Sequence, residues 1–112
     1  MNASELLREL EFIAERPWFI ASPVTFATVQ SFLNGLRVGC RLAGIMYTWD
    51  DLFAAAESRG WDARGNIGIV RHFNRAGLTD EEMVRELLAV EVDAFRRSMA
   101  RPPGSTRRED MA

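Results

Sequence analysis

Apolar residues recur at helical spacing through most of this chain. The first such stripe begins after Asn2 and stops before Pro17. Asn2 is suited to cap a helix, and Glu5 stands three residues later, as in a capping box. Proline disfavours helical backbone in the residue before it, so we expect the first helix at about 3–15. Its apolar stripe consists of Leu6, Leu7, Leu10, Ile13 and Ala14.

A short break with two large aromatic residues follows, made of Arg16, Pro17, Trp18 and Phe19. Such a break is costly unless its aromatic rings pack against something, so we predict a structural corner in which Trp18 and Phe19 are packing anchors. Ser22-Pro23 then predicts a new helix, because serine caps well and proline loses nothing at the first helical position. Two roles stay open for Arg16, either binding the corner's carbonyls or facing a partner.

The second predicted helix runs to about residue 43 and ends at Gly44. Gly35 and Gly39 lie inside it on one face, each costing roughly 1 kcal/mol relative to alanine. We expect another helix of the same chain to approach this face closely. A kink or self-association through the glycine face are the alternatives. The apolar side of this helix consists of Phe26, Val29, Phe32, Leu33, Leu36 and Cys40.

Three further helices complete the pattern. Thr48 is suited to cap the third, which Gly60 can end in the left-handed conformation. A short fourth helix is expected at about 67–75, with Gly77 after it. Thr79 opens a full capping box at 79–82, so the last helix begins there. The apolar stripe of the last helix consists of Val84, Leu87, Leu88, Val92, Phe95 and Met99.

These patterns predict an all-α protein, a compact bundle of about five helices with short links. The chain has 112 residues, and no segment reads convincingly as a strand. We expect one domain over residues 1–101. Two prolines and a glycine at 102–104 end the last helix, and residues 102–112 read as a disordered tail.

The distribution of charge along the chain argues mainly against a nucleic-acid partner. All fourteen basic residues are arginine, and the net charge is −2. A nucleic-acid backbone needs a basic face, and only Arg64, Arg71, His72 and Arg75 cluster. We expect a solvated helix face there, and nucleic acid is not the expected partner. A small DNA-binding regulatory protein using this cluster is kept as an alternative.

Cysteine usage and hydropathy bear on the compartment. The lone Cys40 cannot form an internal disulfide, and it lies in an apolar helical stretch. The N-terminus lacks a basic-then-apolar signal pattern, and no run approaches the ~18 apolar residues that span a bilayer. We therefore expect a cytoplasmic protein without membrane association.

No residue pattern identifies a catalytic, metal or cofactor site. His72 has no assignable orienting partner, and the sequence has no Cys pair or His pair at metal-ligand spacing. Glu86, Glu91 and the acids at 80–82 are expected on exposed helix faces. We therefore expect no catalytic residues, no metal and no cofactor. A small carboxylate-based enzyme remains an alternative, and it would need a pocket holding an acid of raised pKa.

The three tryptophans, Trp18, Trp49 and Trp61, stand at the edges of predicted helices, where we expect them to seal the core. Tryptophan is also enriched in interface hot spots. If the protein binds a basic partner, the predicted contact patch combines one tryptophan with nearby acids. This patch consists of Trp49, Asp50, Asp51, Glu57 and Asp62.

Over about residues 5–97 the chain resembles a loosely defined family of small bacterial α-helical proteins. The resemblance is carried by the Arg-Pro corner at 16–19, the Phe-Leu-x-Gly segment at 32–35, Trp61, the Leu-Leu pair at 87–88 and Phe95. Trp18, Phe19 and Leu36 differ from that pattern. The resemblance implies a cytoplasmic accessory or immunity-type protein without catalytic residues. It would bind another protein, such as a toxin domain, and its oligomeric state stays open.

Overall fold

The computed structural model of this protein, described here for residues 2–44, 49–61 and 69–100, is all-α. This confirms the predicted fold class, and none of the described residues lies in a strand. The predicted tail at 102–112 is outside the described residues. The elements are α1 (Ala3–Glu15), the short 3-10 helix η1 (Pro17–Phe19), α2 (Phe26–Leu42), α3 (Trp49–Ser58), α4 (Ile69–Arg75) and α5 (Asp80–Ala100).

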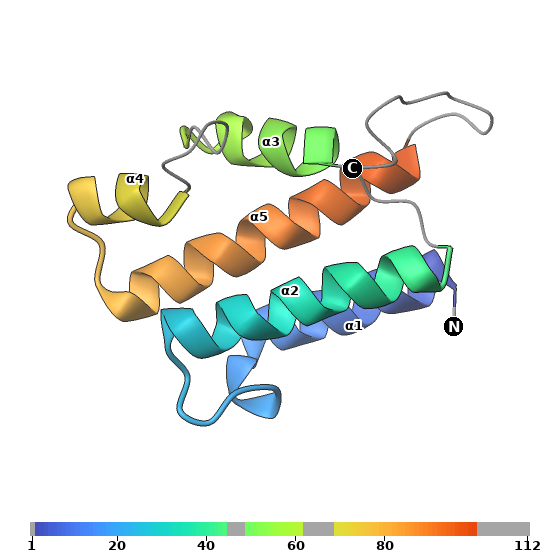
Figure 1. The fold of residues 1–112 in the computed structure, drawn as a ribbon, viewed down its shortest axis with the longest axis horizontal. Helices are drawn as coiled ribbons and strands as arrows, with labels where there is room; N and C mark the ends of the chain where they lie inside the picture. The colour runs from blue at the N-terminus through green and yellow to red at the C-terminus, as the bar shows by residue number, and fades with distance from the viewer. Residues whose placement is uncertain (1, 45–48, 62–68, 101–112) are drawn as a thin grey trace.

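The longest helix, α5, lies between α3 and α4 on one side and α1 and α2 on the other (Figure 1). Its predicted apolar stripe is buried as expected except for Met99, which is 41% exposed near the helix end. Every other helix can therefore bury its own stripe against α5 or next to it. Beside α5, the main core is built from Leu10 of α1, Val29 and Leu33 of α2, and Phe73 of α4.

A second, smaller core joins α3 to α5. It consists of Ala55 and Ala56 on α3 with Val90 and Ala94 on α5. Three of these four side chains are methyl groups, which lets the two helix backbones come close. Leu52 of α3 packs at the margin of this contact.

Two of the predicted helix starts are confirmed in atomic detail. Asn2 Oδ1 accepts a bond from the Glu5 amide at 2.9 Å, and Glu5 Oε1 accepts one from the Asn2 amide at 2.9 Å. The same reciprocal arrangement links Thr79 and Glu82: the Thr79 amide donates to Glu82 Oε1 at 2.8 Å, and the Glu82 amide donates to Thr79 Oγ1 at 3.1 Å. Both capping boxes use chemistry that lies within three residues, so the sequence alone reveals them.

The start of α2 differs from the prediction. Ser22 does not cap a helix; its bond to Pro23 is cis, and α2 begins at Phe26. Thr25 is the N-cap, because its Oγ1 accepts the Thr28 amide at 3.2 Å while Thr28 Oγ1 accepts the Thr25 amide at 3.0 Å. The Phe26 amide donates across the fold to both carboxylate oxygens of Asp80, at 3.1 Å each. This long-range bond fixes the beginning of α2 against the beginning of α5.

The expectation of a helix packed on the glycine face of α2 is wrong. A Cβ placed on Gly35 or Gly39 meets no described atom within 4 Å. The core lies on the other face of α2, where Val29, Leu33 and Cys40 point inward. Both glycines are therefore exposed, and their cost as helix-interior residues has no compensating contact in the described part of the chain.

One ion pair lies inside the bundle, against the expectation that Glu91 sits on an exposed helix face. Glu91 has no exposed surface, and its Oε1 accepts a bond from Arg37 Nη2 at 2.7 Å. Its Oε2 accepts a longer bond from Arg37 Nε at 3.3 Å, so the contact is two-pronged. The pair joins α2 to α5 across the core.

Candidate functional site

The contact patch predicted on α3 does not form one exposed surface. Asp51 is only 5% exposed, and it lies in the first turn of α3, where the positive end of the helix stabilises a carboxylate. Trp49 is partly covered by Phe53, whose ring centroid is 6.2 Å away. Glu57 is exposed and Asp50 is half-buried, while Asp62 falls outside the described residues. The prediction that these five residues face a partner together is therefore wrong for Asp51.

The break predicted as a structural corner is the 3-10 helix η1, but its aromatic rings are not buried in the core. Trp18 and Phe19 are each 63% exposed, so neither is an anchor in the core. Their two rings stack with centroids 6.4 Å apart. The ring of Phe19 also packs against that of Phe12 on α1, with a centroid distance of 5.2 Å. We call the exposed group of Phe12, Arg16, Trp18 and Phe19 the aromatic corner.

Local backbone hydrogen bonds hold the turn that carries these rings. The Phe19 amide donates to the Arg16 carbonyl at 3.0 Å, and the Ile20 amide donates to the Pro17 carbonyl at 3.1 Å. This single turn of 3-10 helix, with proline at its first position, reverses the chain between α1 and the segment before α2. Ala21, rather than the aromatic residues, packs against the core after the turn.

The structure shows contacts of Arg16 within the protein, where the sequence left two roles open. Its guanidinium carbon lies 4.5 Å from the centre of the Phe12 ring, in a cation–π contact. Its Nη1 donates to Glu15 Oε1 at 3.2 Å. Arg16 therefore holds Phe12 and the end of α1 in place while its own side chain stays 41% exposed at the edge of the aromatic corner.

A groove of about 570 Å³ adjoins the aromatic corner, and Trp18 belongs to both. It lies between the end of α1, η1 and the first turns of α5. Val84 and Leu88 of α5 lie at its base, since both belong to the buried core. We call it the corner groove. Its lining residues are Ala14, Glu15, Pro17, Trp18, Val24, Asp80, Glu81, Val84, Arg85 and Leu88.

The charges of the corner groove are mainly negative. Glu15, Asp80 and Glu81 line it, against the single guanidinium of Arg85. Arg85 lies 3.8 Å from Glu81, and both side chains are well exposed, so this pair is worth little. Glu15 stands at the C-terminal end of α1, where the helix carries partial negative charge. The partial negative charge of this helix end adds to the charge of Glu15, and Arg16 offsets part of it through its bond to Glu15.

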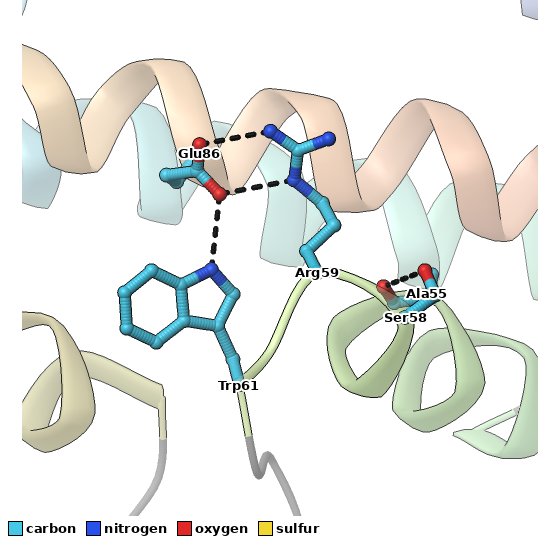
Figure 2. A network of polar contacts seen from close by, with 5 residues as sticks. All are labelled: Ala55, Ser58, Arg59, Trp61 and Glu86. Carbon is cyan, nitrogen blue, oxygen red and sulfur yellow. Dashed lines mark hydrogen bonds and ion pairs between the residues drawn. The ribbon is translucent and has the colours of Figure 1, made fainter.

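Glu86 forms a second polar site, which has a structural explanation (Figure 2). Arg59 binds its carboxylate with two bonds of 2.9 and 2.8 Å, and Trp61 Nε1 donates to it at 2.9 Å. The bonds from Arg59 lower the pKa of Glu86, burial raises it, and the bond from Trp61 lowers it further. Glu86 is thus held as an anion that fixes the end of α3 on α5, rather than lying on an exposed face as predicted.

The remaining candidates for chemistry are dispersed. Burial raises the pKa of the Cys40 thiol, and the charge of Glu91 adds to this effect. Arg71 and Arg75 are exposed on the seven-residue α4, and Arg64 of the same predicted cluster is outside the described residues. Among residues 2–44, 49–61 and 69–100, no three His, Cys, Asp or Glu side chains are grouped to hold a metal ion. Within the same ranges, no helix is both long enough and apolar enough to span a membrane.

Sequence reasoning singled out Arg16, Trp18 and Phe19 but expected the two aromatic residues to be packing anchors, and it missed both Phe12 and the groove. The groove joins residues 14–24 to residues 80–88, and no local pattern connects these two segments. Comparisons with protein-family models, curated proteins and solved structures found no match. The proposal for the function therefore rests on the geometry of this site.

Proposed function

We propose that this protein is a non-enzymatic protein-binding module whose contact surface is the aromatic corner with the adjoining groove. The observation that carries the proposal is the exposure of Trp18 and Phe19, which form one contiguous patch with Phe12. An apolar patch rimmed by polar residues is typical of an interaction surface. Tryptophan, tyrosine and arginine dominate interface hot spots, and the corner offers Trp18 and Arg16.

The charge at this surface favours a protein over a nucleic acid. Glu15, Asp80 and Glu81 would repel a phosphate backbone, which needs a basic face for affinity. The proposed contact surface thus moves from the acidic residues of α3 to the corner between α1 and α2. It keeps the expectation that the partner is another protein, and its negative charge suits a partner with basic character.

An immunity-type role is the specific form of this proposal. In it, the module acts in the cytoplasm and neutralises a toxin domain by covering it. Co-expression with a toxin encoded next to this chain would test it, and cell survival that depends on Trp18 and Phe19 is the expected result. Failure of the intact chain to protect would remove the immunity role while leaving protein binding open.

The general proposal is tested by partner capture with matched variants. The full chain is immobilised as wild type, as the Trp18→Ala/Phe19→Ala variant, and as Leu42→Ala, a control at an apolar residue that is 84% exposed on α2. We expect mass spectrometry to identify a protein that the wild type and the control retain and the corner variant loses. Equal retention on all three, or no retained protein on the wild type, would overturn the proposal.

A further inference from the structure

We propose that the corner groove accepts an aliphatic side chain of the partner, with an arginine or lysine beside it that binds at Glu15 and Trp18. This inference rests on the proposed protein-binding function and names the chemistry of the bound segment. It follows from two features of the groove, its apolar base and the unequal distribution of charge along its walls.

The apolar part of the groove is preformed. Val84 and Leu88 are 3% and 1% exposed, so they are fixed by the core beneath them. Pro17 and Val24 stand on the walls, and Val24 is among the exposed apolar residues of the chain. An aliphatic side chain placed here removes apolar surface from water on both partners at little cost in ordering the groove.

The charged part of the groove favours a cation at one end. Near α5, the positive N-terminal end of the helix offsets Asp80 and Glu81, and Asp80 is already engaged by the Phe26 amide. Near α1, the negative helix end adds to the charge of Glu15, whose side chain is 76% exposed. The exposed indole of Trp18 lines the same groove and can stack on a guanidinium or an ammonium group.

Arg16 competes for this position only partly. It donates one 3.2 Å bond to Glu15 between two exposed side chains, which is an exchangeable contact. Its guanidinium is also held over the Phe12 ring, on the side of the aromatic corner. A partner cation can therefore share or replace the bond to Glu15 without unfolding any element.

The test is a selection of random 12-residue peptides displayed on phage against the immobilised full chain. Enriched peptides are synthesised with a fluorescent label, and their affinity is measured by anisotropy. We expect them to carry an aliphatic residue within a few positions of arginine or lysine. Replacing that cation by glutamine in the peptide is expected to weaken binding about two- to fivefold, as for an exposed ion pair.

Protein variants locate the cation. Glu15→Gln is expected to weaken binding of the original peptide by the same factor. It is expected to have no further effect on binding of the peptide whose cation is replaced by glutamine. Glu9→Gln, at an exposed acid on the same helix, is the matched control and is expected to change nothing. Trp18→Ala is expected to weaken the binding of both peptides, because it removes part of the groove wall.

The other outcomes separate this inference from the proposed function. Apolar peptides without a cation, lost on Trp18→Ala but unaffected by Glu15→Gln, would overturn the inference and leave the protein-binding corner in place. No enriched peptide, or peptides insensitive to both variants, would overturn the groove as a peptide site, while partner capture still decides on the corner. A dimer of this chain that depends on Trp18 but not on Glu15 would replace the proposed occupant with a second copy.

Discussion

At the scale of single residues, Arg37 and Glu91 form an ion pair whose carboxylate side chain has no exposed surface. Taking a carboxylate fully out of water is costly unless its charge is matched and its oxygens are bonded. Arg37 supplies both, and its Nη1 also donates to Asn34 Oδ1 at 2.9 Å. Its guanidinium carbon lies 5.9 Å from the Trp49 ring, so the same side chain reaches from α2 to the first residue of α3.

Removing one partner of this pair is predicted to be far worse than removing both. Arg37→Met leaves Glu91 buried without its counter-charge and is expected to lower the free energy of unfolding by about 3 kcal/mol. The double variant Arg37→Met/Glu91→Leu is expected to recover most of that loss. Urea denaturation followed by circular dichroism measures both. A single variant within about 0.5 kcal/mol of wild type would show that the pair is not desolvated as described.

Glu86 makes a prediction about acid stability. Its pKa is lowered from the ordinary value of 4.5, with the bonds from Arg59 as the largest cause. A carboxyl whose pKa is lower in the folded state stabilises the fold above its unfolded pKa, and this contribution is lost as the pH falls through the folded pKa. We expect Glu86→Gln to cost about 1 kcal/mol at neutral pH, given the partial exposure of the site.

The sign of the effect is checked by comparing wild type and Glu86→Gln in urea at about pH 7 and at about pH 3. The difference between them is expected to shrink at the lower pH, because the stabilisation by ionised Glu86 declines once the pH falls below the pKa of the unfolded chain. Other carboxyl groups titrate equally in the two proteins and cancel in the difference. A difference that grows on acidification would contradict the lowered pKa of Glu86.

At the scale of elements, local chemistry determines which helix ends the sequence reveals. Asn2 with Glu5, and Thr79 with Glu82, need only three residues of context, and both predictions are confirmed. Ser22-Pro23 also has a sequence typical of a helix start, yet the N-cap of α2 is Thr25. Thr25 and Thr28 offer a local cap of the same kind, and the Phe26 amide also binds Asp80, more than fifty residues away.

Burial could be predicted only where a stripe repeats. The apolar stripe of α5 repeats over about four turns, so its inward face is confirmed for all but Met99. Trp18 and Phe19 belong to a turn without a period, and their exposure depends on what lies opposite them in space. Glu91 is the reverse case, an acid whose burial depends on Arg37 from another helix. The groove was unpredictable for the same reason.

The glycines of α2 provide the element-scale prediction. Gly35 and Gly39 have helical backbone and open space at Cβ, so Gly35→Ala and Gly39→Ala are expected to stabilise the chain by about 0.5–1 kcal/mol each. Gly60→Ala is the contrast, because its φ of 90° strains any residue with a Cβ, and it is expected to destabilise. Measuring the midpoint of thermal unfolding for the three variants tests these expected changes in stability. Destabilisation by either α2 variant would mean that the glycine face has a close partner after all.

At the scale of the whole molecule, two of the aromatic groups have different roles. Inside, Phe73 of α4 makes edge contacts with Phe26 at 6.1 Å and with Trp61 at 4.9 Å. This group connects α2, α4 and the end of α3 within the main core. Outside, Phe12, Trp18 and Phe19 pack on one another at the corner and contribute little buried area. The first group stabilises the fold, while the second is available to a partner.

This division predicts that stability and binding respond oppositely to the same kind of truncation. Phe73→Ala removes a ring with no exposed surface and is expected to cost about 3–5 kcal/mol in the free energy of unfolding. Phe19→Ala, at a ring that is mostly exposed, is expected to cost at most about 1 kcal/mol and to weaken partner binding at least tenfold, as a hot-spot residue does. Urea denaturation and partner affinity are measured on both variants under conditions where Phe73→Ala remains folded. If Phe19→Ala unfolds the chain as readily as Phe73→Ala, the corner is a structural element, and the binding surface must be sought elsewhere.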